Sequence, residues 1–556
     1  MTDGQPWTPM PLVRGTNGAV VAPHHLASTA GLRVLADGGS AVDAAIASNA
    51  VLAVVKPSSC GIGGDAFWLI WDAAAGRQHA LNGSGRAAAA ADAASLRASG
   101  LAAMPKRGPL SITVPGAVRS WGDAHERFGR LPRTRILEPA IALARDGFAA
   151  WDGFIHGVER TAPLVREVLG PDAGFFAVFR PRDRAWRPGE RVRLPALAAT
   201  LQTLADEGFD AFYDGDLAAR QAAALAAAGS PITEVDLRSH TATWGDPIER
   251  SYRGVRVTTH PPNSSGMVAL EILAILERFE PPAADAFGPD GVSDARWIHL
   301  GLETAKLAMA DRDAFLTDPD FREVPIETLL DATYAADLAA RIDERHATPP
   351  RPTTNPPGGG TIYLATVDRD GNAVSLIESN YMGFGSGVVD PATGIHYQNR
   401  GSYFSLDPAH PNVLEPHKRT LHTLLPGMLF RDGVPGPWVV AGSMGGDAQP
   451  QVHAQLVSAM VDGGLDVRTA VAAPRWYIEP ADHFVPPIDV HLEPRHASGV
   501  AEALAELGHR LVPTAAFDAN LGHEHAIELI DGGPSTADGS LSAATDPRSE
   551  GLPAVW

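Results

Sequence analysis

Cysteine is nearly absent from this chain of 556 residues, in which Cys60 is the only one. A single cysteine cannot form an internal disulfide, so nothing in the sequence demands an oxidising compartment, and we expect Cys60 to be a small buried residue. Basic residues are also scarce: 45 Lys and Arg stand against 65 Asp and Glu, which gives a net charge of −20. Binding to nucleic acid or to an anionic membrane needs clustered Lys and Arg. We therefore expect a small-molecule substrate and neither a nucleic-acid nor a membrane partner.

Long hydrophobic runs are missing as well. No segment approaches the roughly 18 consecutive apolar residues of a membrane span, and the N-terminus "MTDGQPWTPMPLVRG" lacks a basic region followed by an apolar core. We expect a cytoplasmic protein, although a periplasmic chain whose signal had been removed would show the same sequence. The composition is 45% hydrophobic, ordinary for a globular protein.

Hydrophobic patterns along the chain alternate between helical and strand-like spacing. "HHLASTAGLRVLAD" (24–37) and "SAVDAAIASNAVLAVV" (40–55) predict two helices in series, the second opened by a capping box of Ser40 and Asp43. "AFWLIWD" (66–72) predicts a strand. Further helices are predicted mainly within 110–150, 193–229, 267–316, 449–462 and 497–507, and further strands at 386–397, 423–430 and 437–441. This order predicts a layered α/β sandwich with sheets inside.

The strongest change of composition falls at "TPPRPTTNPPGGG", residues 348–360. Such Pro- and Gly-rich segments are usually solvated linkers. The residues that follow favour a second interpretation, because "TIYLATV" alternates, "DRDG" supplies a turn and "NAVSLIES" alternates again, so that a hairpin begins at Thr361. The segment is either a joint between domains or a place where the chain is cut before Thr361.

A cut at this point would create a reactive group. A threonine hydroxyl is a weak nucleophile unless a base lies beside it, and the α-amine of an N-terminal Thr, with a pKa of roughly 7.7–8.0, can be that base. Glycines before Thr361 allow the strained backbone in which its Oγ attacks the carbonyl of Gly360. The turn "AGSMGGDAQPQ" (441–451) can supply adjacent N–H groups for an oxyanion, although most Gly-Gly pairs are plain turns.

Taken together, the motifs resemble the γ-glutamyltranspeptidase family of N-terminal nucleophile hydrolases. "GGGTIYLATVDRDGNAVS" is similar to the processing site of that family. Other similar segments follow in family order: "DGGSAVDAAIA" (37–47), "GIGGDAF" (61–67), "TVPGAV" (113–118), "PPNSSGM" (261–267), "ADRDAFLTDPDF" (310–321), "FGSGVV" (384–389) and "GSMGGD" (442–447). The resemblance implies an αββα sandwich that processes itself into a large subunit, 1–360, and a small subunit, 361–556, which form one intertwined domain. It implies a heterodimer, or a dimer of heterodimers, acting on a small acyl amide.

Individual site residues follow from the resemblance. Thr361 matches the nucleophile, and Ser379 stands where the family has a Thr whose hydroxyl supports the nucleophile and its maturation. Gly445 and Gly446 match the oxyanion-hole pair. No cofactor or metal is implied, and "HEH" (523–525) lacks a third metal ligand.

The acyl pocket departs from the transpeptidase pattern. Tyr381, Arg400 and Tyr403 stand where transpeptidases hold the α-ammonium of the γ-glutamyl group with an Asn and two acidic or amide groups. No carboxylate remains there to pair with an ammonium, and Arg400 would repel one. The site should therefore prefer an acyl group that carries a carboxylate or no charge.

Three further positions complete the expected pocket. His422 and Thr423 replace the paired serines that hold the α-carboxylate in transpeptidases, and a structural role for His422 is equally favoured. The family Arg of the "FRE" segment is missing from "NGSGRA", where Arg86 is a nearby substitute.

These departures resemble the acylase branch of the family, which includes cephalosporin acylases that remove glutaryl side chains, and an oxamate-hydrolysing relative. We expect an N-terminal threonine amide hydrolase or acyltransferase that cleaves acyl amides such as glutaryl cephalosporins, with residual γ-glutamyl transfer. The alternatives are a true γ-glutamyltransferase or glutathione hydrolase, an oxamate-type amidohydrolase, and, from another class, an unprocessed binding protein without catalysis.

Overall fold

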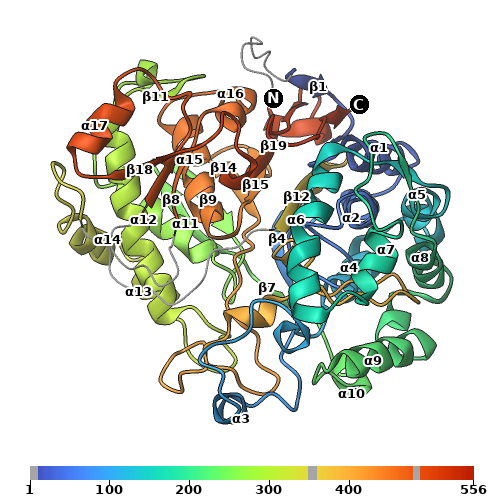
Figure 1. The fold of residues 1–556 in the computed structure, drawn as a ribbon. Helices are drawn as coiled ribbons and strands as arrows, with labels where there is room; N and C mark the ends of the chain where they lie inside the picture. Colours follow the sequence, from blue (N-terminus) through green and yellow to red (C-terminus); the bar gives the residue numbers. More distant parts are fainter. Residues whose placement is uncertain (1–10, 349–359, 480–488) are drawn as a thin grey trace.

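Two seven-stranded β-sheets lie face to face between two layers of helices (Figure 1). The computed structural model describes residues 11–348, 360–479 and 489–556. Buried apolar side chains of both sheets meet between them, among them Phe67 and Tyr363 from one sheet and Met428 and Ile527 from the other. The predicted αββα sandwich is confirmed.

The first sheet is built around one hairpin. Its strand order is β21-β2-β12-β13-β3-β4-β7, with antiparallel neighbours throughout. The strands are β2 (Ala19–Val21), β3 (Asp65–Asp72), β4 (Arg77–Gly83), β7 (Thr243–Gly245), β12 (Gly360–Val367), β13 (Ala373–Tyr381) and β21 (Ala554–Val555). In the turn between β12 and β13, the Asp368 carboxylate accepts the backbone N–H groups of Asp370 and Asn372. The hairpin predicted at Thr361 is therefore confirmed.

The second sheet has the order β1-β20-β19-β15-β14-β9-β8. Its strands are β1 (Val13–Gly15), β8 (Ile248–Tyr252), β9 (Val255–Thr259), β14 (Gly427–Arg431), β15 (Val439–Met444), β19 (His523–Ile530) and β20 (Ser540–Ala544). Each sheet thus combines strands from before and after the predicted cut.

Helices cover the outer face of each sheet. Those on the first sheet, at the right of Figure 1, include α1 (His25–Ala36), α2 (Ala41–Val55), α4 (Ala117–Phe128), α5 (Arg133–Asp146), α6 (Asp152–Leu169) and α8 (Pro195–Glu207). Those on the second include α11 (Gly266–Leu276), α15 (Gln449–Val461) and α16 (Val467–Ala472), with α12 (Ala295–Phe315) packed on α11 and α17 (Val500–Glu506) packed on α12.

Helix α2 lies against the central hairpin. Every one of its residues is buried, and it contacts both β12 and β13. A helix buried on all sides needs no polar face, which accounts for its run of Ala and Val. The predicted capping box of Ser40 and Asp43 is present.

One strand prediction is wrong. Residues 386–397 form turns with two isolated bridges, one between Val389 and His396 and one between Gly63 and Tyr397. Gly387 has a φ of 78°, a left-handed conformation that interrupts an extended strand, and Pro391 cannot donate a backbone hydrogen bond to a sheet. The composition break at 348–360 lies outside the described residues except at its two ends.

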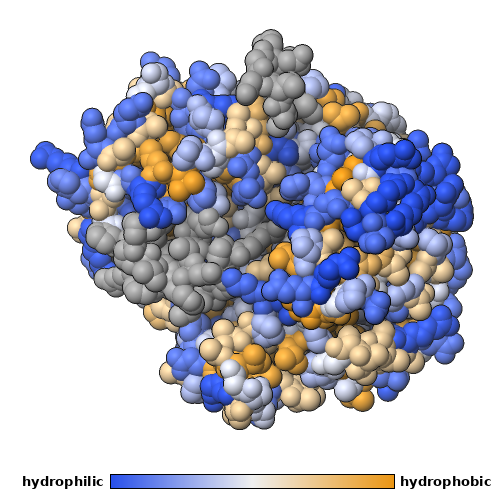
Figure 2. Space-filling view, viewed as in Figure 1, coloured by the Kyte–Doolittle hydropathy of each residue, from blue (hydrophilic) through white to orange (hydrophobic). Residues whose placement is uncertain are grey.

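Hydrophilic side chains cover most of the face seen in Figure 2, with apolar residues in small groups between them. Among the described residues, no helix has the length and apolar character that crossing a membrane requires.

Candidate active site

Thr361 and Ser379 face each other across the central hairpin. They are paired in register, with a bulge between Gly360 and Thr361, and both are 1% exposed. Thr361 Oγ1 lies 2.9 Å from Ser379 Oγ, which in turn lies 2.7 Å from the carbonyl oxygen of Gly360. The Ser379 hydroxyl therefore touches both the predicted nucleophile and the peptide bond predicted to be cut.

The partners of the Ser379 hydroxyl determine which of its hydrogen bonds it donates and which it accepts. The Gly360 carbonyl can only accept, so the single Ser379 hydroxyl proton points to it. The Ser379 oxygen accepts the N–H of Tyr381 at 2.7 Å, and its second lone pair faces two donors, the Thr361 hydroxyl at 2.9 Å and the Arg400 guanidinium at 3.3 Å. Such an arrangement polarises a carbonyl while drawing the proton from the group that would attack it.

Arg400 lies directly behind this pair, in a short 3-10 turn (Arg400–Tyr403). Its Nη2 is 3.3 Å from Ser379 Oγ and its Nη1 is 3.4 Å from Thr423 Oγ1. The guanidinium carbon stacks 4.5 Å from the ring centroid of Tyr381 and 5.4 Å from that of Tyr403. The structure thus brings together four of the residues predicted for the acyl pocket.

The Arg400 guanidinium is 1% exposed, its Nε has no hydrogen-bond partner, and it forms no ion pair with any described residue. Burial lowers its pKa, but an arginine remains protonated in a protein. An unpaired charge in a buried site is costly, and it becomes favourable only when an anion joins it.

A carboxylate that the sequence reasoning missed lies beside the pocket. The buried Asp447 follows Gly446 directly, and its carboxylate accepts the Tyr403 hydroxyl at 3.3 Å. It is also hydrogen-bonded by Arg312, a buried residue of α12 that pairs with Asp313 at 2.9 Å as well. Asp447 therefore has a cation already. Its place in the motif "GSMGGD" was the signal by which the sequence could have identified it.

Asp65 is a second carboxylate that the sequence reasoning missed. It opens β3 opposite Ser379 and accepts the backbone N–H of Gly85 at 2.9 Å. Its other oxygen lies 3.3 Å from Nε2 of His422, whose pKa burial holds well below the ordinary value, so the imidazole is neutral. Burial raises the pKa of Asp65 to about 7, although Arg400 opposes this shift. His422 thus contacts Asp65, whereas Thr423 contacts the guanidinium.

Gly445 and Gly446 form the turn between β15 and α15. Their φ values of 143° and 58° are conformations that favour glycine. Gly445 and Gly360 line one cavity of about 740 Å³. Gly445, one of the two predicted oxyanion donors, thus lies on the same cavity as Gly360, and the catalytic role of both glycines stays a prediction.

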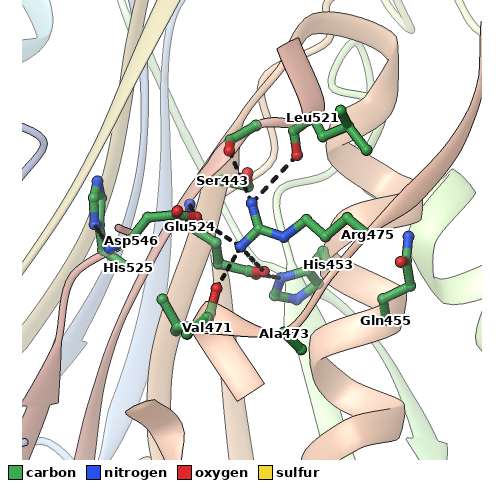
Figure 3. A network of polar contacts seen from close by, with 12 residues as sticks. Ser443, His453, Gln455, Val471, Ala473, Arg475, Leu521, Glu524, His525 and Asp546 are labelled. Atoms are coloured by element: carbon green, nitrogen blue, oxygen red, sulfur yellow. Dashed lines mark hydrogen bonds and ion pairs between the residues drawn. The ribbon is translucent and has the colours of Figure 1, made fainter. Parts of the chain in front are cut away.

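A buried charge network supports the glycine turn (Figure 3). Arg475 lies 2.7 Å from the Asp546 carboxylate and 3.8 Å from Glu524, and it donates to the carbonyls of Leu521 and Gly522. A Cβ on Gly445 would lie 3.2 Å from the Cα of Gly522, so these two backbones are packed closely. Arg475 therefore fixes the segment against which the turn rests.

Arg86 does not contact the other residues predicted for the acyl pocket. Its guanidinium pairs with Asp318 at 3.3 Å and Asp320 at 3.0 Å and donates to the carbonyl of His417. Both of its terminal nitrogens are engaged by these groups.

One group of side chains has the composition of a metal site. Ligand atoms of His299, Glu303 and His509 lie within 4.8 Å of one another, and all three residues are buried. The two imidazoles already share a hydrogen bond of 2.8 Å, and Glu303 pairs with Lys306. None of the three lines the cavity beside Gly360.

Two facing sheets between helical layers, with a hydroxyl residue at the start of a central strand, define the class of N-terminal nucleophile hydrolases. The Gamma-glutamyltranspeptidase family model matches residues 27–556, and the chain belongs to this family.

Relatives of known name cover the chain almost completely. The "Glutathione hydrolase-like YwrD proenzyme" of Bacillus subtilis is 38% identical over 97% of this chain and 98% of its own length. The "Oxamate amidohydrolase proenzyme" of Klebsiella pneumoniae is 39% identical over 97% and 99%. The crystal structure of cephalosporin acylase from Bacillus halodurans superposes with a TM-score of 0.90 at 38% identity and covers 100% of this chain and 99% of that one. The chain is therefore similar throughout to hydrolases of this family.

Proposed function

We propose that the chain cuts itself between Gly360 and Thr361 and that Thr361 then acts as the nucleophile of an amide hydrolase. In the first step the Thr361 Oγ attacks the Gly360 carbonyl carbon, and Ser379 accepts its proton and supplies one to the carbonyl oxygen. The tetrahedral adduct then collapses: its hydroxyl proton passes to the departing nitrogen, the carbonyl re-forms and the C–N bond breaks, which gives an ester and a free α-amine. Water hydrolyses the ester, leaving the carboxylate of Gly360. The contacts of Ser379 with both reacting groups support this step.

In the mature enzyme Thr361 Oγ attacks the amide carbon of the substrate. The Thr361 amine takes the hydroxyl proton and delivers it to the departing amine, and the N–H groups of Gly445 and Gly446 stabilise the oxyanion. Water then hydrolyses the acyl ester, or an acceptor amine takes the acyl group. The subunits 1–360 and 361–556 would remain together because both sheets contain strands of each.

The observation that carries the substrate class is the buried guanidinium of Arg400. A carboxylate on the acyl group would pair with it. The distance from the Arg400 guanidinium to the Thr361 hydroxyl is short, because Arg400 Nη2 contacts Ser379 and Ser379 contacts that hydroxyl. A carboxylate bonded directly to the scissile carbonyl, as in oxamate, suits this span. The similarity to an oxamate amidohydrolase supports the same choice.

A glutaryl amide is the second candidate. Its carboxylate lies three methylene groups beyond the carbonyl, and it would have to reach a nitrogen of Arg400 farther from Thr361. The similarity to a cephalosporin acylase supports it, and the cavity of about 740 Å³ beside Gly360 offers room for a large leaving group. A γ-glutamyl group is disfavoured, because Asp447, which would bind its ammonium, is paired with Arg312.

The test combines a denaturing gel with a substrate panel. We expect two fragments, the smaller one beginning at Thr361, and hydrolysis of oxamate that exceeds that of glutaryl and γ-glutamyl 4-nitroanilides. A single uncut band would support a non-catalytic binding protein and refute the proposal. Preference for the γ-glutamyl amide would refute the role of Arg400.

A further inference from the structure

The cavity beside Gly360 carries positive charge at one end. Arg107 and Arg160 line it together with Gly360 and Gly445. Neither arginine forms an ion pair with a described residue, in a chain whose net charge is −20. The region beside the predicted reaction centre therefore carries two positive charges without a counter-charge in the described part of the chain, although the molecule as a whole is strongly negative.

Both guanidinium groups lie against Gly383, in the loop that follows β13. Arg107 Nη1 donates to the carbonyls of Gly383 at 2.8 Å and Gly385 at 2.7 Å. A Cβ on Gly383 would lie 3.6 Å from Nη2 of Arg160, which comes from α6. Burial and the charge of Arg160 together lower the pKa of Arg107 to about 10, so both groups are charged at neutral pH. Like charges held this closely favour a bound anion.

The carboxylates that line the same cavity have partners other than the two arginines. Asp447 is paired with Arg312, and Asp518 accepts the backbone N–H of Asn520. Glu550 interacts with the buried Lys56. None of these groups neutralises the two arginines.

We propose that Arg107 and Arg160 form the leaving-group side of the site and bind a carboxylate on the amine part of the substrate. This inference rests on the proposed function, because it takes the Gly360 end of the cavity as the reaction centre. Arg400 would then select the acyl side and this pair the amine side, so that among amides of one acyl group those with a carboxylate on the amine part are preferred. Two guanidinium groups suit a carboxylate because each can donate two hydrogen bonds to it.

The experiment uses the processed enzyme and two substrates that share the best acyl group from the panel. One has 4-nitroaniline as the leaving amine and the other has 3-carboxy-4-nitroaniline. We expect the wild type to favour the carboxylated anilide in kcat/KM by about tenfold more than Arg160→Ala does, with the difference mainly in KM. Arg160 is exposed and unpaired, so its removal should leave the fold intact. Arg166→Ala, an exposed arginine of the same helix, is the matched control and should keep the wild-type ratio.

Two measurements separate failure of this inference from failure of the proposed function. If both anilides are hydrolysed and the ratio is the same in the wild type and Arg160→Ala, the function stands and the subsite is refuted; the new Gly360 carboxylate would be one alternative occupant of the pair. If neither anilide is hydrolysed, binding of 3-carboxy-4-nitroaniline is measured by calorimetry. Binding to the wild type that weakens in Arg160→Ala would support the subsite without the activity, and equal or absent binding would overturn it.

Discussion

Replacing Ser379 by alanine removes the one hydroxyl that contacts both Thr361 and the Gly360 carbonyl. The variant loses the donor that stabilises the developing oxyanion. Loss of one such donor costs about 2.7–4 kcal/mol in the barrier, or about 10²–10³ in rate. We therefore expect self-cleavage of Ser379→Ala to be slower than that of the wild type by this factor.

The assay is the time course of the two fragments on a denaturing gel, starting from freshly purified precursor. Ser379→Thr keeps the hydroxyl and should restore much of the rate. Ser375→Ala is the matched control: Ser375 lies on the same strand and contacts Tyr363 and Gly427 instead. Removing Ser379 also leaves the Tyr381 N–H without its acceptor, so thermal unfolding must show that each variant is folded. Cleavage of folded Ser379→Ala within a few-fold of the wild type would refute the reasoning.

Three further predictions concern charge. Arg400→Gln should lower kcat/KM for an acyl amide with a carboxylate by about 30-fold or more, because truncating one partner of a buried charge pair costs roughly 2–5 kcal/mol; an equal loss on a neutral acetyl amide would contradict this. Burial raises the pKa of Asp65 from 3.8 to about 7, so between these values the folded state holds a proton that the unfolded chain has lost, and stability falls as pH rises through this window. Asp65→Asn should remove that part of the slope, as measured by chemical unfolding from pH 5 to 8, and an unchanged slope would argue against it. Arg475→Ala leaves Glu524 without its cation and Asp546 with Arg548 alone, and it should cost about 3 kcal/mol in unfolding free energy, whereas Arg468→Ala, at a partly exposed residue of α16, should cost little.

Local patterns predicted what depends on neighbouring residues. The capping box of α2 and the hairpin that begins at Thr361 follow from spacing within about twenty residues, and both are present. The approach of Ser379 to Thr361 follows from the same hairpin, because its register pairs the two positions directly. The segment 386–397 had a strand-like composition, but its glycine conformations outweighed that preference.

The electrostatics of the site could not be predicted in this way. Arg312 reaches Asp447 from 135 positions earlier in the chain, and Asp65 reaches His422 across 357 positions. Both carboxylates lie inside segments that resemble the family, "GSMGGD" and "GIGGDAF". Their partners depend on how the two sheets and α12 pack, which is not a local property. The pairing of Arg86 with Asp318 and Asp320 depends in the same way on distant segments.

Both sheets contain strands from each side of the predicted cut, and this has a consequence for refolding. In the uncut chain the strands before and after position 360 are tethered, so each meets its neighbours at a high effective concentration. Once Gly360 and Thr361 are separated, the same pairing becomes a second-order encounter between two polypeptides. Recovery from denaturant should then depend on protein concentration for the processed enzyme and not for an uncut Thr361→Ala precursor. After maturation, refolding would be less efficient, and the lifetime of the folded enzyme would depend on its rate of unfolding.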